Sequence, residues 1–284
     1  MRRGNDMTRY RYWSERQIRA LERDNGLRLG RSWRIATAGT PGSMFGIPLP
    51  ALGFQRSEVR ERSRRQVADR VTAALREQTA VTYDEEYPVL FARGLGKVAF
   101  SAFTDGPARD KGVVLHTRIQ SNSGQRVDLC LFGSLDNAAD FRPGEALEGS
   151  SSSAWYAVAE LLESRGQRNT SQWDDQGLAV EALEIALGDR ERGEDGTSGD
   201  PWTRRWTLGH AIDVEWLAVI YSDVTLDRGR WRFDGGSALV GTQRIIVGAP
   251  VWVRAPGPRS VVRYADLRRA AASSPTGWRR LVSG

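Results

Sequence analysis

Cys130 and His116 are the two side chains of this sequence best suited to act together in catalysis. An imidazolium beside a thiol lowers the thiol pKa, and the thiolate is the form that attacks a substrate. The alternative interpretation is structural, because a free cysteine is commonly a small buried hydrophobic residue. We favour the structural interpretation, since no recognisable oxyanion-binding element accompanies the pair.

The pair depends on a β-hairpin that folds back at Ser121–Gly124, because residues of alternating polarity precede and follow this turn. One aliphatic side of the hairpin is expected to face the core. A register that sets His116 opposite Cys130 also sets Arg118 opposite Asp128, as a reactive rim or as an ordinary cross-strand ion pair. A shift of two residues would separate both pairs.

A small-anion site is the second candidate. Gly133 and Ser134 end an expected strand, and Ser150 and Ser151 precede an expected helix, so their backbone amides are suited to phosphate or carboxylate. Glycine in a turn and serine at a helix start are also common without any ligand. Neither GxxxxGK[ST] nor a GxGxxG between strand and helix is present, which disfavours those nucleotide sites.

Nucleic-acid binding is the third candidate. Arg60, Arg64 and Arg65 give the start of an expected helix a basic face that suits phosphates. The chain has a formal net charge of +6, but Lys97 and Lys111 are its only lysines. Such an arginine bias is typical of GC-rich coding and weakens charge as an argument. Without interleaved aromatic residues, a solvated helix end is favoured.

Metal binding has little support in the sequence. One cysteine and two histidines are too few for a zinc site of the Cys/His type, which leaves carboxylate-bound Mg²⁺ or Ca²⁺ open. His210 and Asp213 would share a helix face if 203–223 is helical, but such pairs are common on solvated helices. We expect no metal or other cofactor.

No stretch of the sequence approaches the roughly 18 to 20 apolar residues of a membrane span, so we expect a cytoplasmic protein without membrane attachment. Periodicity and turn residues predict helices at 15–24, 57–78, 154–163, 178–187 and 203–223. They predict strands at 10–13, 33–38, 88–91, 97–103, 113–119, 127–132, 243–254 and 261–264.

Most strands precede most helices and one strand returns late, which predicts the α+β class. The expected architecture is a mixed, mainly antiparallel sheet with helices packed on it. Residues 1–8 are expected to be a flexible extension, 9–268 a single domain and 269–284 a polar tail. A boundary inside the domain, if there is one, is expected at the Gly/Pro/Ser-rich stretch 142–153.

Aromatic, glycine and strand residues at several places in the chain resemble an uncharacterised family of actinobacterial proteins. They are Tyr10 to Gln17, Gly94 to Phe100, Cys130 to Ser134, Asn137 and Arg244 to Val253. The resemblance spans most of the chain and implies one intact domain of GC-rich bacterial origin. It implies no activity, cofactor or site residue.

These observations predict a non-enzymatic cytoplasmic protein that recognises a protein partner or a small anionic ligand, as an accessory of a bacterial multi-protein system. One alternative is an enzyme that uses Cys130 and His116. The other is a basic nucleic-acid-binding protein that uses Arg60, Arg64 and Arg65.

Overall fold

The chain forms two compact units in the computed structural model, one from Met1–Glu15 with Gln78–Gly284 and the other from Arg16–Glu77. The residues that the structure describes are 10–27, 29, 31–32, 43–44, 47–48, 60–61, 63–84, 90–103, 112–121, 123–138, 154–164, 174–191, 207–226, 229–233, 235 and 237–256.

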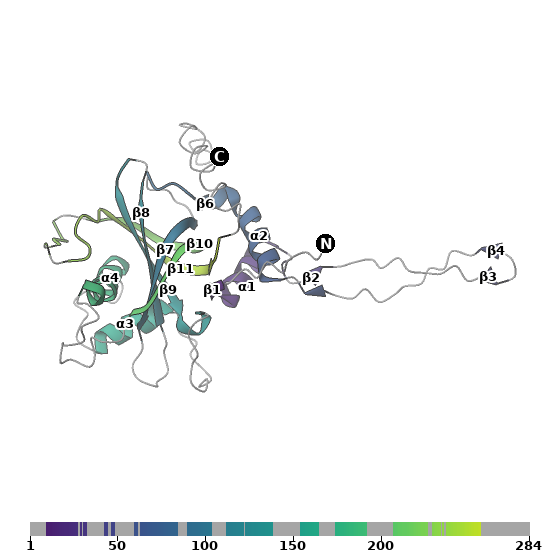
Figure 1. Cartoon of the computed structure of the whole chain (residues 1–284), viewed down its shortest axis with the longest axis horizontal. Coiled ribbons are helices and arrows are strands. Elements are labelled where there is room, and N and C mark those ends of the chain that lie inside the picture. Colours follow the sequence, from purple (N-terminus) through teal and green to yellow (C-terminus); the bar gives the residue numbers. More distant parts are fainter. Residues whose placement is uncertain are drawn as a thin grey trace. The chain divides into compact units, whose positions relative to one another are not determined.

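Five strands of the larger unit close into a β-barrel (Figure 1). They are β7 (Phe91–Phe103), β8 (Gly112–Gln120), β9 (Arg126–Ser134), β10 (Thr207–Thr225) and β11 (Arg244–Arg254). Around the ring the order is β11-β10-β7-β8-β9, with four antiparallel pairings. The ring closes because β9 and β11 pair in parallel.

This closure shows that the predicted α+β class is wrong. A sheet with helices packed on it would leave β9 with one partner, whereas β9 pairs with β8 on one side and β11 on the other. Two short strands extend the ring: β1 (Tyr10–Trp13) pairs with β11, and β6 (Thr79–Ala80) pairs with β7. The β9–β11 pairing joins segments far apart in sequence, so no local pattern indicated it.

The predicted helix at 203–223 is also wrong, because residues 207–223 lie in β10. Its apolar residues mimic helical spacing since β10 is irregular. The pairing with β11 shifts register between Leu217 and Ala218 and again between Ile220 and Ser222. The extra residue is Val251 of β11 at the first shift and Tyr221 of β10 at the second, so the second shift breaks the simple alternation of β10.

The predicted hairpin and its register are confirmed. β8 and β9 pair antiparallel, with His116 opposite Cys130 and Arg118 opposite Asp128. The aliphatic side of the hairpin faces the barrel interior, where buried side chains from every barrel strand meet. That interior cluster includes Val98, Phe100, Val113, Leu115, Val127, Leu129, Leu131, Trp216, Ile246 and Val253.

A glycine in β7 makes room for the largest interior side chain. Trp216 is only 1% exposed, and a Cβ atom at Gly94 would lie 2.3 Å from its ring. Only a residue without a side chain lets the indole approach β7 this closely. Gly96 follows with a φ of +152°, next to a register shift between β7 and β10, where the strand bends.

Two helices pack on the outside of the barrel: α3 (Ala154–Ser164) and α4 (Asp175–Glu191) (Figure 1). Both predicted helices are confirmed, but α4 continues past Gly188, where the sequence suggested an end. The outward side chains of the barrel wall join the helices in a second buried cluster. Its members include Val114, Cys130, Phe132, Val158, Leu162, Leu178, Leu183, Ile245 and Val247.

The smaller unit contains most of α1 (Glu15–Asp24), which confirms the predicted helix at 15–24. Two short strand pairs follow: β2 (Arg31–Ser32) with β5 (Arg60–Glu61), and β3 (Ser43–Met44) with β4 (Ile47–Pro48). The helix α2 (Arg64–Ala74) comes next and is followed by the short helix η1 (Arg76–Gln78). In the larger unit, the short helix η2 (Leu135–Asn137) follows β9.

The helix expected at 57–78 begins later than predicted. Ser63 is the N-cap of α2, and it forms a capping box with Gln66. The Ser63 side chain accepts the Gln66 N–H, and the Gln66 side chain accepts the Ser63 N–H. The predicted strands 33–38 and 261–264 lie outside the described residues. No helix in the described ranges is long and apolar enough to cross a membrane.

Candidate functional site

The candidate site lies at the barrel end where β8 and β10 finish and β9 and β11 begin. Asp128, the third residue of β9, is its centre and is fully buried. Its Oδ1 lies 2.7 Å from His116 Nε2 and accepts from Arg118 Nε at 3.1 Å. Its Oδ2 accepts from Arg126 Nε at 2.8 Å and from Thr242 Oγ1 at 2.7 Å. We call these five residues the Asp128 cluster.

The Asp128 carboxyl is ionised in this setting. Burial alone raises its pKa, but the hydrogen bond and charge interaction with His116, the bond from Thr242 and the charge of Arg126 lower it. The balance puts the pKa well below the ordinary value of an aspartate. Because an ionised carboxylate only accepts hydrogen bonds, His116 must carry its proton on Nε2.

Arg118 and Arg126 connect the cluster to the loop between β10 and β11. Nη2 of each arginine donates to the carbonyl of Ala238, at 3.2 Å from Arg118 and 2.8 Å from Arg126. Nη1 of Arg126 also donates to the carbonyl of Val240. The two guanidinium groups therefore hold the loop against the barrel wall.

The loop is further ordered by its own hydrogen bonds. The N–H of Thr242 donates to the carbonyl of Leu239 at 2.9 Å, and Gly241 between them has a φ of +81°, a conformation that favours glycine. Ser237 Oγ donates to Glu184 of α4 at 3.0 Å. These contacts involve residues 237–242, and the Val240 side chain among them is 43% exposed.

The two arginines of the cluster differ in how far their side chains are exposed to solvent. The side chain of Arg126 is 20% exposed and that of Arg118 is 48% exposed, although both contact the same buried carboxylate. Two guanidinium groups share one carboxylate, so these three side chains together keep positive charge in excess. Arg118 presents that charge to solvent.

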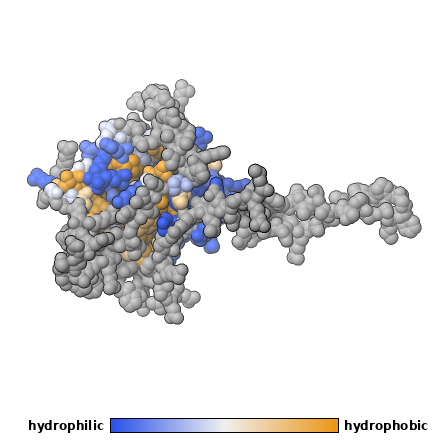
Figure 2. Space-filling view, in the orientation of Figure 1, coloured by the Kyte–Doolittle hydropathy of each residue, from blue (hydrophilic) through white to orange (hydrophobic). Residues whose placement is uncertain are grey.

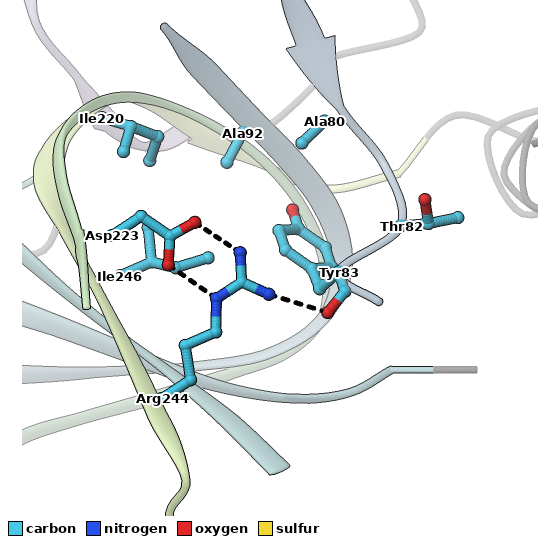
Figure 3. Close-up of a pocket in the computed structure, with 8 residues that line it drawn as sticks. All are labelled: Ala80, Thr82, Tyr83, Ala92, Ile220, Asp223, Arg244 and Ile246. Atoms are coloured by element: carbon cyan, nitrogen blue, oxygen red, sulfur yellow. Dashed lines mark hydrogen bonds and ion pairs between the residues drawn. The ribbon is translucent and has the colours of Figure 1, made fainter. Parts of the chain in front are cut away.

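A second ionic group lies at the same barrel end, facing the interior (Figure 3). Arg244 is only 2% exposed. Its Nε donates to one oxygen of Asp223 at 2.6 Å, and its Nη2 donates to the other oxygen. Its Nη1 donates to the carbonyl of Tyr83 at 2.9 Å. Apolar side chains including Ile220 and Ile246 complete a pocket here. Its enclosed space is about 10 Å³, room for about one water molecule.

The structure keeps Cys130 away from solvent. The thiol is fully buried in the outer cluster with α3 and α4, and burial, followed by the nearby charge of Asp128, raises its pKa. His116 faces Cys130 across the ladder, yet its Nε2 binds Asp128. This setting favours the neutral thiol over the nucleophilic thiolate.

Gly133 is explained by packing inside the barrel. A Cβ atom there would lie 2.5 Å from the hydroxyl oxygen of Tyr12, which is itself 1% exposed. Burial raises the pKa of Tyr12 to about 12, and Asn137 Nδ2 donates to its hydroxyl at 3.3 Å. Ser134 precedes η2 without a side-chain capping bond. Ser150 and Ser151 lie outside the described residues.

The basic residues predicted to share one helix face are divided between two elements. Arg60 is in β5, whereas Arg64 and Arg65 are the first residues of α2 and are exposed. His210 and Asp213 lie in β10, so the expected helical i,i+3 pair does not form. Within the described ranges, no three His, Cys, Asp or Glu side chains gather as a metal ion would require.

Sequence reasoning named His116, Arg118 and Asp128 and the cross-strand Arg118–Asp128 pair, but it missed Arg126 and Thr242. Arg126 could have been found, because it lies two residues before Asp128 and therefore on the same side of β9. Thr242 and Arg244 could not, since the parallel β9–β11 pairing brings them here.

The fold defines this protein as a closed Greek-key barrel. Numbered along the chain, its strands follow the circular order 1-2-3-5-4, which resembles the topology of the OB-fold, whose strands 2 and 3 form a binding face. The equivalent outer face carries Val114, Cys130 and Phe132, and here α3 and α4 cover it.

Comparisons with protein-family models, curated proteins and solved structures give no match. The resemblance to an actinobacterial family therefore stays a prediction.

Proposed function

We propose that this protein is a non-enzymatic binding protein that recognises a partner or a small anionic ligand at the Asp128 cluster. The observation that carries the proposal is the position of Arg118. Its guanidinium is fixed by Asp128 and the Ala238 carbonyl, yet the side chain remains half exposed. A charge that is already ordered loses little conformational entropy when it binds an anion.

The surface at this end also supports recognition rather than a purely structural role. Val240 is exposed at the tip of the loop, and its carbonyl accepts from Arg126. Figure 2 shows apolar residues next to hydrophilic ones on the visible face. Mixed surfaces of this kind are suited to partner binding.

Catalysis has less support in this geometry. The Asp128 carboxylate already accepts four hydrogen bonds and has a lowered pKa, so it is a poor general base. The thiol of Cys130 is buried and has a raised pKa. A cytoplasmic accessory role in a bacterial multi-protein system is consistent with these features and remains part of the proposal.

Native mass spectrometry tests the proposal. The protein, purified under non-denaturing conditions from its own cells, should carry an additional mass that is depleted in Arg118→Ala. Arg19→Ala is the matched control, because Arg19 is an exposed arginine of α1 outside the cluster. A wild-type protein without added mass, or a mass retained equally by Arg118→Ala, would refute binding at this cluster.

A further inference from the structure

We infer that Arg118 binds the carboxylate of an acidic residue in a protein partner. This inference rests on the proposed function and names the chemical class that the Asp128 cluster recognises.

The donors of Arg118 are partly used. Its Nε binds Asp128 and its Nη2 binds the Ala238 carbonyl, while no hydrogen bond from its Nη1 to another described residue is present. Nη1 and the second hydrogen of Nη2 together form the planar fork that binds a carboxylate through two parallel hydrogen bonds. The existing contacts fix the plane in which this fork lies.

The charge of the cluster favours an anionic partner group. Arg118 and Arg126 supply two positive charges against the single negative charge of Asp128, so these three side chains keep positive charge in excess. The carboxylate of an acidic residue would compensate this charge where Arg118 meets solvent.

The side chain next to the arginines favours a peptide over a free small carboxylate. Val240 is 43% exposed, and its own carbonyl accepts from Arg126, which places an apolar side chain at the same loop tip. A partner segment with an apolar residue beside its acidic residue would cover Val240 while the acid reaches Arg118. Acetate or another free carboxylate would use only half of this surface.

Fluorescence anisotropy with a labelled peptide of alternating glutamate and leucine tests the inference. The peptide should bind the wild-type protein, and Arg118→Ala should weaken binding roughly tenfold or more, because a charge-assisted bidentate contact is lost. Arg118→Lys should weaken binding less, and Arg19→Ala should leave it unchanged. Val240→Glu should also weaken binding, through repulsion and loss of the apolar contact.

Competition experiments identify the chemistry. Acetate should displace the peptide only weakly, and inorganic phosphate should compete no better than acetate at equal ionic strength. Failure of the peptide to bind, binding unchanged in both Arg118→Ala and Val240→Glu, or stronger competition by phosphate would overturn the inference. An Arg118-dependent small molecule in native mass spectrometry would overturn it while leaving the proposed function intact.

Discussion

His116 lies directly opposite Cys130 in the β8–β9 ladder, and its Nε2 nevertheless binds Asp128 at 2.7 Å. The imidazole is therefore engaged with the carboxylate of the cluster, while α3 and α4 bury the thiol. Two residues that are adjacent in the barrel wall thus belong to different environments, one polar and one apolar.

The burial of Cys130 predicts an inert thiol. In the folded protein, 5,5′-dithiobis(2-nitrobenzoate) at pH 8 should react only as fast as the protein unfolds, because the raised thiol pKa and the lack of access both suppress attack. After denaturation, the one thiol should react at once. Rapid stoichiometric reaction of the native protein would contradict the assigned burial.

Asp128→Asn should destabilise the fold by about 3–5 kcal/mol, because it removes the fully buried negative charge that Arg118, Arg126 and Thr242 all contact. Urea unfolding followed by tryptophan fluorescence measures the effect. Asp24→Asn is the matched control, since Asp24 is exposed at the end of α1, and it should change stability by no more than about 0.5 kcal/mol. Equal effects of the two substitutions would exclude a central role for Asp128.

The lowered pKa of Asp128 predicts acid sensitivity. Because its pKa is lower in the folded state than in the unfolded state, the unfolded chain binds the proton more readily. The contribution of Asp128 to stability is therefore full above the unfolded pKa of about 4 and is lost as the pH falls toward the folded pKa.

Urea midpoints at pH 6 and pH 3 test this acid sensitivity. The wild-type midpoint should fall more than that of Asp128→Asn, which cannot lose this carboxylate. Asp174 also has a lowered pKa and adds a common background to both proteins, so the comparison between them isolates Asp128. Parallel losses in both would mean that other groups cause the acid sensitivity.

The close approach of Tyr12 to Gly133 predicts overpacking. Gly133→Ala should destabilise the protein by about 1–3 kcal/mol, because the added methyl group would lie 2.5 Å from the Tyr12 hydroxyl. Tyr12→Phe should relieve part of that cost in the double variant. Gly235→Ala is the control, since a Cβ atom at Gly235 would meet no other atom within 4 Å and the backbone there needs no positive φ. Thermal unfolding of the four variants provides the comparison.

The hydrogen bonds of Arg244 to Asp223 and to the Tyr83 carbonyl predict that Arg244 stabilises the interior pocket. Arg244→Leu would leave the Asp223 carboxylate without its bidentate partner and free the Tyr83 carbonyl. Hydrogen exchange around Tyr83, which follows β6, should then accelerate more than exchange in α1. Unchanged exchange near Tyr83 would show that Arg244 does not hold this segment.

The sequence was sufficient for the β8–β9 hairpin because two independent signals agree there. Alternating polarity sets the side that faces the core, and the turn at Ser121–Gly124 sets the register. It was insufficient for β10, where the extra residue Tyr221 disturbs the alternation that would have indicated a strand. Local pattern is reliable only where the strand is regular.

The Asp128 cluster was only partly predictable for a related reason. Arg118 and Asp128 are neighbours within one hairpin, so the local register brings them together. Thr242 joins through tertiary contacts that depend on where β11 lies in the ring. The same dependence explains why glycine at 133 suggested a ligand, whereas it accommodates a side chain from β1.

The parallel pairing of β9 with β11 has a consequence for how the protein is made. While a ribosome is still synthesising β11, β9 has emerged with one side of its backbone unsatisfied. Exposed strands of this kind are the sites at which nascent chains aggregate or engage chaperones. Completion of the barrel must therefore wait until translation has delivered Arg244–Arg254.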